Sequence, residues 1–230
     1  MAPRQPPKRR GRLIAKVAVA GLAAAGAATI SYAFSDQAHA PVPKPSAAGR
    51  IAPGVPGPSG RRTQAPAAPD SLRGGSAGPG PASLPSAVSV PAIGVNSTLE
   101  QLGLNPERSV AVPSSFQQAG WYDHSAQCGQ PGPSVILGHV DSYRGPGVFF
   151  RLGALAPGDA VILRCADGGT EIFTITGVRQ YSKDAFPTLA VYGPTVTPTI
   201  RLITCGGAFD HASGHYLSNV IAFGELESRT

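Results

Sequence analysis

The sequence lacks the short motifs that mark common metal and cofactor sites. It contains no C-x-x-C pair, and its histidines and cysteines match no zinc-ligand spacing. No G-x-G-x-x-G opens a helix, no phosphate-binding loop occurs, and no segment repeats. Only 14% of the residues are charged, and only three are cysteines. We therefore expect no metal and no organic cofactor, so that any chemistry comes from ordinary side chains.

Acidic residues are missing from the N-terminus, and this accounts for the net charge. The formal charge is +6, and the first sixteen residues contain six basic side chains and no acidic one. Removing those six from the 19 basic residues leaves 13, which equals the 13 acidic residues. A nucleic-acid-binding domain needs a basic patch on its folded surface, so the neutral remainder indicates no nucleic-acid partner.

An uncharged stretch of 18 residues, 17–34, follows the basic N-terminus. This pattern marks export, and a helix of that length would extend ~27 Å, enough for a thin hydrocarbon core. Positive charge before it predicts that residues 1–16 lie in the cytoplasm and the rest of the chain outside. The alternative is a signal peptide cleaved after Ala40, although Pro41 should obstruct cleavage. We expect a single-pass membrane protein or, if the segment is cleaved, a secreted one.

Residues 35–86 are rich in proline, glycine and alanine and contain almost no large aliphatic side chains. Such a composition cannot bury enough surface to offset the entropy of ordering the chain. As a flexible coil, residues 41–86 would separate their ends by ~35–40 Å. We expect a disordered tether whose removal leaves the stability of the following domain unchanged.

From residue 87 onward the sequence contains short β-type segments and no long 3.6-residue periodicity. Apolar or alternating runs lie between turn residues at 87–95, 134–140, 159–165, 171–178, 199–205 and 219–226. The letters ADGGT at 166–170 indicate a hairpin. Only STLEQLGL, at 97–104, suggests a short helical turn. The pattern predicts a mainly β domain of about 140 residues, either a barrel or a sandwich.

Three cysteines in an oxidising compartment leave one unpaired. Cys128 lies in a Gly/Pro loop, and Cys165 ends a predicted strand before the hairpin. If these two form a disulfide, Cys205 is the free thiol; it ends the run TIRLITC directly before a glycine pair. It is then either a small buried side chain or a nucleophile at a strand end. The cysteines alone do not decide between the two.

A nucleophilic thiol needs a base or a cationic neighbour, and His139 is the best candidate among five histidines. It ends the apolar run SVILGHV behind a glycine, as Cys205 ends its own run. Two strands that each bring a reactive side chain to a glycine-marked end predict a Cys-His site. A structural histidine before an Asx turn at Asp141 is the alternative. The other histidines occur in the export segment or in polar loops, where exposure is expected: His39, His124, His211 and His215.

The order of the histidine and the cysteine along the chain distinguishes among families of Cys-His enzymes. Papain-like peptidases place the cysteine before the histidine, and L,D-transpeptidases place it in a different loop sequence; here His139 in GHVDS precedes Cys205 in LITCGG. Together with VPAIGV, GWY, DAFPT and NVIAF, these motifs resemble the sortases, most closely the actinobacterial class F group. The resemblance covers nearly all of residues 87–226.

This resemblance implies a closed eight-stranded sortase-type β-barrel and a Gram-positive cysteine transpeptidase. Such an enzyme cleaves a Leu-Pro-x-Thr-Gly-type sorting signal of secreted proteins between Thr and Gly. It holds the Thr carbonyl as a thioester and passes it to an amine on a cell-wall precursor or pilin. By motif match, Cys205 would be the nucleophile and His139 the general acid and base, while residues 227–230 would form a tail.

One residue of the sortase pattern is absent. An arginine is expected on the last strand, about a dozen residues after the cysteine, where it steadies the substrate and the oxyanion; this chain has Leu217 there. Two residues are candidates for that support. Arg201 lies on the same strand face as Cys205 but ~13 Å along the strand, and a structural role is its alternative. Asn219 could donate a hydrogen bond instead.

Two other functions stay open. A thiol hydrolase of the same fold would resolve the thioester with water, and an amine-acceptor assay separates it from a transpeptidase. A non-enzymatic envelope-binding domain would keep a structural or oxidised Cys205, which thiol counting tests.

Overall fold

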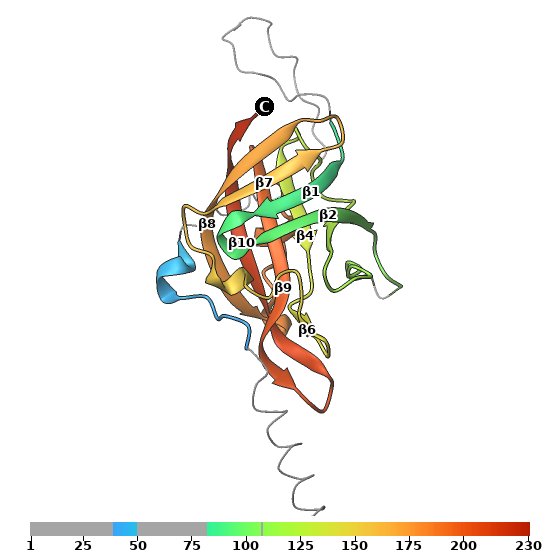
Figure 1. Ribbon diagram of the computed structural model, residues 1–230, viewed down its shortest axis with the longest axis vertical. Helices are drawn as coiled ribbons and strands as arrows, with labels where there is room; N and C mark the ends of the chain where they lie inside the picture. The colour runs from blue at the N-terminus through green and yellow to red at the C-terminus, as the bar shows by residue number, and fades with distance from the viewer. Residues whose placement is uncertain (1–38, 50–81, 107) are drawn as a thin grey trace, which may run out of the picture. The chain divides into compact units, whose positions relative to one another are not determined.

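Eight strands close into a barrel in the computed structural model, which describes residues 39–49, 82–106 and 108–230 (Figure 1). Around the barrel the order is β1-β2-β3-β4-β9-β10-β8-β7. The barrel strands are β1 (Pro85–Val90), β2 (Val95–Leu102), β3 (Ala119–Tyr122), β4 (Gly132–Leu137), β7 (Ala160–Cys165), β8 (Thr170–Ser182), β9 (Pro198–Asp210) and β10 (His215–Arg229). The predicted mainly β, eight-stranded barrel is confirmed.

The pairing within the barrel is mixed. β2 pairs with β3, and β4 pairs with β9, in parallel; every other neighbouring pair is antiparallel. Two short strands, β5 (Asp141–Ser142) and β6 (Gly145–Pro146), form a separate hairpin after β4. The other elements of the described residues are short: η1 (Pro45–Ala48), η2 (Pro91–Ile93), η3 (Leu152–Ala154), η4 (Lys183–Ala185) and α2 (Thr188–Tyr192).

The structure refines several of the expected elements. The hairpin at ADGGT is confirmed, because β7 and β8 are joined there and Gly168 has φ +90°, a value that favours glycine. The helical turn expected at 97–104 is wrong: most of this segment is β2, which pairs with β1 and β3. The barrel also extends beyond the expected 87–226, from Pro85 to Arg229.

Alternate residues of β9 and β10 pack into two separate apolar clusters. Ile200, Leu202, Val220 and Ala222 belong to the larger cluster, which also includes residues of β1, β2, β4, β7 and β8. Residues of opposite parity, such as Ile203, Ile221 and Phe223, belong to a smaller cluster with Val191 of α2. Since successive side chains of a strand point to opposite faces, the larger cluster fills the barrel and the smaller one lies outside it under α2.

Residues 40–49, part of the expected disordered linker, pack against the barrel in the structure. Ala47 is buried and joins the larger cluster. Arg179 of β8 donates from Nε to the Ala48 carbonyl and from Nη2 to the Gly49 carbonyl, each at 3.1 Å. A Cβ on Gly49, which has φ +41°, would lie 1.7 Å from the Thr176 carbonyl oxygen, so only glycine allows this approach. The linker prediction is therefore wrong for 40–49. It also fails within 82–86, because Ser83 forms a β-bridge with Cys128 and β1 begins at Pro85. For 35–38 and 50–81 it lies outside the described residues.

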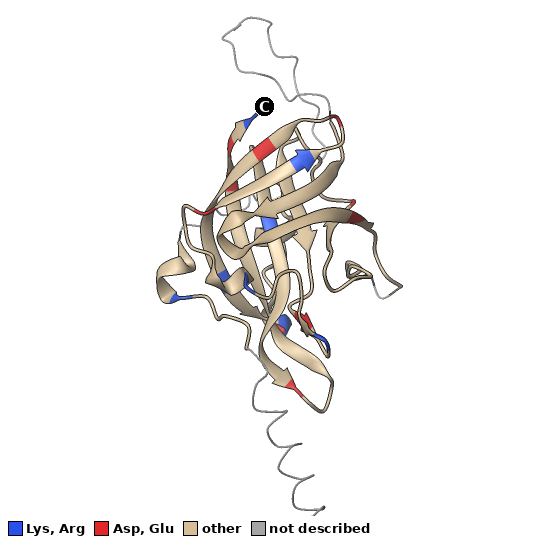
Figure 2. Ribbon diagram, viewed as in Figure 1, with Lys and Arg blue, Asp and Glu red and all other residues tan. Residues whose placement is uncertain are grey.

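Charged side chains are sparse on the barrel, and both signs are interspersed (Figure 2). No helix among the described residues is long and apolar enough to cross a membrane. The segment 17–34, predicted to be an anchor or signal, lies outside those residues.

Candidate active site

Cys205 lies in the middle of β9, because the strand continues to Asp210. The prediction that Cys205 ends a strand is therefore wrong. The glycines after it have a different cause: a Cβ on Gly206 would lie 2.7 Å from Cγ2 of Val220, and Gly207 has φ +76°. Opposite them, the β9–β10 register shifts between Tyr216 and Ser218. The glycine pair thus accommodates a β-bulge beside the cysteine.

Cys205 faces outward, on the side of the sheet that α2 covers. It shares the parity of Ile203, which packs in the smaller cluster. Its side chain is half-buried, and it is the free cysteine of the chain. Asn219 of β10 is its direct partner in the ladder, so the two side chains lie on the same face. Asn219 is half-buried too, and its amide has no hydrogen-bond partner among the described residues.

The paired register of β4 and β9 ends two residues before both His139 and Cys205. These strands run parallel, with Leu137 opposite Ile203, and the Gly138 N–H donates to the Ile203 carbonyl at 3.0 Å. Cys205 lies two residues after Ile203 in β9, and His139 lies two residues after Leu137, beyond the end of β4. His139 does follow the end of its strand, since β4 ends at Leu137.

The hydrogen bond of His139 defines its tautomer. Its Nε2 lies 2.8 Å from the Pro113 carbonyl oxygen. A carbonyl only accepts, so Nε2 carries the proton and donates it there. In the neutral imidazole the basic atom is then Nδ1. The Phe116 ring packs on the imidazole with centroids 4.5 Å apart.

The loop that holds His139 is itself anchored. Glu100 of β2 accepts two hydrogen bonds from Ser114, from the backbone N–H at 2.8 Å and from the hydroxyl at 3.0 Å. Further along, the Phe116 carbonyl accepts from the Val148 N–H at 2.8 Å. These contacts fix the loop between β2 and β3 against the segment that follows His139. Sequence reasoning missed them, because they join residues far apart in the chain.

A second polar pair lies close to the thiol. The Tyr216 hydroxyl donates to Oδ2 of Asp141 in β5. Burial raises the pKa of Tyr216, and the hydrogen bond to Asp141 and the charges of Asp141 and Cys205 act in the same direction. The Phe209 ring packs edge-on against Tyr216 at 5.1 Å. Asp141 lies in the quoted GHVDS motif, but nothing in the sequence indicated its partner.

Arg201 is held under α2 by its own contacts. Its Nε donates to the Ala190 carbonyl at 3.2 Å, its Nη1 donates to the Ile200 carbonyl at 2.9 Å, and its guanidinium lies 4.9 Å from the Phe223 ring centre. Burial lowers the pKa of Arg201 to about 10. These contacts match the structural alternative for this residue. Leu217, at the position where an arginine was expected, is exposed.

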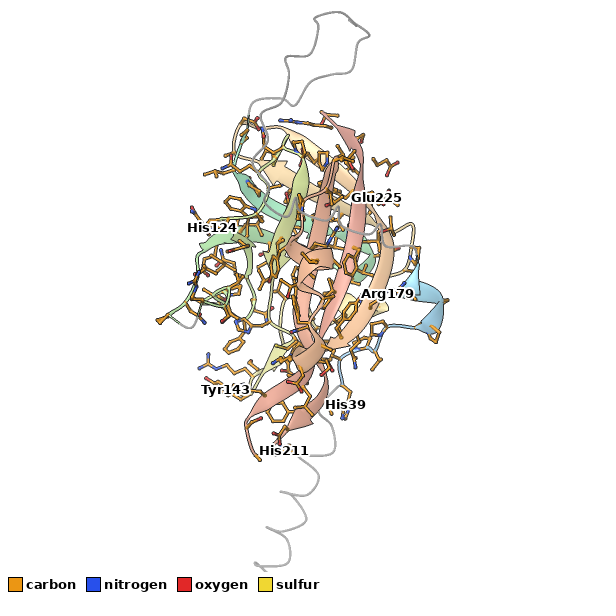
Figure 3. All side chains as sticks on the ribbon, turned by 180° about the vertical axis from the view of Figure 1, so that it is seen from behind. His39, His124, Tyr143, Arg179, His211 and Glu225 are labelled. Carbon is orange, nitrogen blue, oxygen red and sulfur yellow. A yellow bond between two sulfur atoms is a disulfide. The ribbon has the colours of Figure 1, made fainter. Side chains whose placement is uncertain are left out.

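The other histidines lie at the periphery. The side chain of His124 is 66% exposed, and its Nε2 is 3.6 Å from Oδ1 of Asp123. His211 and His215 flank the β9–β10 turn and are exposed, and Figure 3 shows His211 at the tip of that hairpin. His39 is exposed as well.

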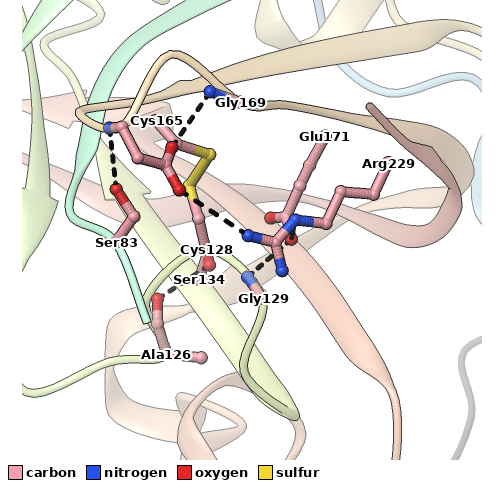
Figure 4. Close-up of polar contacts among 10 residues, drawn as sticks. Ser83, Ala126, Cys128, Gly129, Ser134, Cys165, Gly169, Glu171 and Arg229 are labelled. Carbon is pink, nitrogen blue, oxygen red and sulfur yellow. Dashed lines mark hydrogen bonds and ion pairs between the residues drawn. A yellow bond between two sulfur atoms is a disulfide. The ribbon is translucent and has the colours of Figure 1, made fainter. Parts of the chain in front are cut away.

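The remaining cysteines form a disulfide near the end of β10. Cys128 and Cys165 are bonded, with Cα atoms 6.2 Å apart. Glu171 lies beside them, accepts from the Gly129 N–H at 2.7 Å, and has Oε1 4.0 Å from Nε of Arg229 (Figure 4). The two sulfurs and a Glu171 oxygen lie within 4.8 Å of one another. Because the sulfurs are bonded to each other, they are not thiolates and do not provide metal ligands.

A family model described as a sortase domain matches residues 88–227. No curated protein matches the chain. Among solved structures, sortase C2 of the Group B Streptococcus pilus island 1 is 16% identical, with a TM-score of 0.48, over 62% of this chain and 73% of that one. Sortase C-1 from Actinomyces oris is 17% identical, with a TM-score of 0.48, over 62% and 73%. Sortase A from Listeria monocytogenes is 20% identical, with a TM-score of 0.45, over 64% and 89%.

Proposed function

Because the chain belongs to the sortase family, we propose that it is a cysteine transpeptidase that cleaves a Leu-Pro-x-Thr-Gly-type sorting signal and transfers the acyl group to an amine of the cell envelope. The β4–β9 register carries this proposal. Its last pair, Leu137 opposite Ile203, lies two residues before both His139 and Cys205 in the sequence, and Cys205 is the free thiol of the chain.

In the first half-reaction, the Cys205 thiolate attacks the Thr carbonyl carbon of the sorting signal. The Thr–Gly C–N bond breaks while the His139 imidazolium gives a proton to the leaving amine. The Thr acyl group is then a thioester on Cys205. The hydrogen bond from Nε2 to the Pro113 carbonyl assigns this proton transfer to Nδ1.

In the second half-reaction, an acceptor amine gives its proton to Nδ1 of neutral His139. The nitrogen attacks the thioester carbonyl, the new C–N bond forms, and the C–S bond breaks. The thiolate and the imidazolium are thereby restored, so protons and electrons balance over the cycle. His139 serves as acid in the first step and as base in the second.

Asn219 is our candidate for stabilising the oxyanion. Its amide lies opposite Cys205 in the ladder and has no partner among the described residues. An amide offers two N–H donors, and such a donor near the attacked carbonyl stabilises the charge that develops there. Leu217 offers none.

The class and the location of the enzyme form part of the same proposal. The motifs GHVDS and LITCGG support assignment to the actinobacterial class F group. The basic N-terminus followed by residues 17–34 supports a membrane anchor with the barrel outside the cell. Secreted proteins that carry the sorting signal are then the substrates, and an amine on a cell-wall precursor or pilin is the acceptor.

Trapping the acyl-enzyme tests the proposal. The full-length protein, incubated with a Leu-Pro-x-Thr-Gly peptide, should gain the mass of the peptide up to Thr on Cys205, and a primary amine should release the amide product. Cys205→Ala should form no adduct. Release of the free acid alone would support the hydrolase alternative. A folded wild-type protein with an unreactive Cys205 would support the envelope-binding alternative.

A further inference from the structure

Asp141 carries a carboxylate that no cation neutralises among the described residues. The acidic residues that form ion pairs within the described residues are Asp123, Asp167 and Glu171, and Asp141 is not among them. Asp141 is half-buried, its Oδ2 accepts from the Tyr216 hydroxyl, and its Oδ1 has no partner in the described structure. A carboxylate that is partly removed from water and lacks a counter-charge attracts a cation.

This carboxylate lies beside the proposed reaction centre. Asp141 follows His139 by two residues. Its partner Tyr216 lies on β10, three residues before Asn219, which is opposite Cys205. The hydrogen bond between them therefore connects the segment after His139 to the strand next to the thiol. The charges of Asp141 and Cys205 both raise the pKa of Tyr216, which agrees with a position of Tyr216 close to both groups.

We propose that Asp141, oriented by Tyr216, is the binding subsite for the ammonium group of the acceptor. This inference rests on the proposed function and specifies its acceptor: a primary amine that arrives as a cation. Tyr216 holds Oδ2, which leaves Oδ1 for an N–H⁺ donor. Charge-assisted hydrogen bonds of this kind are about twice as strong as neutral ones.

The two half-reactions respond to this carboxylate in opposite ways. Before acylation, a negative charge close to the thiol opposes formation of the thiolate. After acylation the thioester is neutral, and the carboxylate attracts the incoming cation. The bound ammonium first gives one proton to solvent water, which leaves a neutral amine at Oδ1. Its nitrogen then attacks the thioester carbonyl while a second proton passes to Nδ1 of His139, the C–S bond breaks, and Cys205 leaves as the thiolate. Asp141 binds the acceptor and takes no proton.

Comparing two nucleophiles tests this assignment. The full-length protein is acylated with the sorting-signal peptide and then partitioned between water and either the amide of Nα-acetyl-lysine, which is cationic, or hydroxylamine, which is uncharged at neutral pH. Asp141→Asn keeps an oxygen that accepts from Tyr216 but removes the charge. Tyr216→Phe keeps the ring but releases the carboxylate. Asp184→Asn, which neutralises an exposed residue of η4, is the control for net charge.

We expect Asp141→Asn to reduce transfer to the lysine amide by about tenfold, with acyl-enzyme formation and transfer to hydroxylamine unchanged or faster. Transfer to the cationic amine should weaken with salt in the wild type and lose that dependence in Asp141→Asn. Tyr216→Phe should reduce transfer to the lysine amide by a smaller factor, and Asp184→Asn should transfer to it at the wild-type rate.

Equal loss with both nucleophiles, or a loss confined to acylation, would overturn the subsite and leave Asp141 a positioning residue. Wild-type protein that forms no acyl-enzyme would instead overturn the proposed function, and this inference with it. The acylation step, measured first, therefore separates the two failures.

Discussion

One end of β10 lies next to the free thiol of Cys205, and the other end lies next to the Cys128–Cys165 disulfide. Asn219 is opposite Cys205, while Arg229 is opposite Glu171 beside the Cys128–Cys165 disulfide, and ten residues of an extended strand separate them by ~33 Å. At the disulfide end the sulfurs and the carboxylate are buried, and the carboxylate has a cation nearby. At the thiol end the corresponding groups are half-buried, and the carboxylate has no cation among the described residues. The sulfurs at the disulfide end are bonded to each other, whereas the thiol end keeps a free sulfur.

Removing the imidazole should have the largest effect at the thiol end. We expect His139→Ala to lower kcat/KM for sorting-signal cleavage by ~10²–10⁴-fold, because the leaving amine is no longer protonated. His211→Ala, an exposed histidine on the neighbouring hairpin, is the matched control and should cost little. A Cys205→Ala/His139→Ala double variant should be scarcely worse than either single one. Full activity of His139→Ala would show that another residue is the base.

Removing the disulfide should affect stability and not chemistry. Changing Cys128 and Cys165 together to Ala should lower the free energy of unfolding by about 2–4 kcal/mol, because the bridge closes a long loop. Denaturant unfolding measures this, and the acyl-enzyme yield per folded molecule should be unchanged. A peptide adduct on Cys128 or Cys165 in the wild type would reverse the roles of the two ends.

The segment 40–49, which packs against β8, should stabilise the barrel. Deleting residues 1–49 should lower the free energy of unfolding by about 2 kcal/mol relative to deleting residues 1–38. That deletion exposes the surface under Ala47 and removes two hydrogen bonds from the Arg179 guanidinium. Arg179→Gln in the longer chain should reproduce part of the loss. Equal melting temperatures for the two truncations would restore the tether interpretation for these residues.

Glu100 should act on the thiol end from a distance. Its truncation to Ala frees Ser114 and the neighbouring Pro113 carbonyl, so the tautomer and position of His139 become less fixed. We expect about a tenfold loss in kcat with KM nearly unchanged. Glu100→Gln, whose amide oxygen still accepts from Ser114, should recover most of it. No recovery, or a loss in KM only, would indicate a different role for Glu100.

Glu171 should give the smallest effect, and one that depends on pH. Burial raises the pKa of Glu171 in the folded protein, despite the opposing Gly129 hydrogen bond and Arg229 charge. The stability tied to its neutral form is therefore present below the ordinary carboxyl pKa and is lost as pH rises through the raised value. Glu171→Gln does not titrate, so its melting temperature should gain about 2–4 °C on that of the wild type between pH 4 and pH 8. A constant difference would contradict the raised pKa.

Much of this arrangement follows from local patterns. Alternating runs and the ADGGT turn predicted the β domain. The odd cysteine count predicted one unpaired thiol if the chain is exported, with Cys128 and Cys165 as the candidate pair, and the structure joins these two. The helical turn predicted at 97–104 was wrong. Leu, Glu and Gln favour helices in isolation, but pairing with β1 and β3 makes most of the segment a strand. Tertiary pairing overrode local propensity.

The supporting contacts of the site could not be predicted from the sequence. His139 and Pro113 are 26 residues apart, and Asp141 and Tyr216 are 75 apart. Nothing local encodes such contacts; they depend on how the strands register in the closed barrel. The glycine pair after Cys205 shows the same limit. Glycines occur both at strand ends and at β-bulges, so the sequence alone does not distinguish the two.

The hydrogen bond that engages Nε2 of His139 has a kinetic consequence for the proposed reaction. With one ring nitrogen committed to Pro113, the departing glycine amine and the arriving acceptor amine must use the same atom, and hence the same space, in succession. No ternary complex of acyl donor and acceptor can form there. The cleaved fragment and the acceptor should therefore compete for the acyl-enzyme, with parallel lines in double-reciprocal plots and reversal of the first step by excess glycyl fragment.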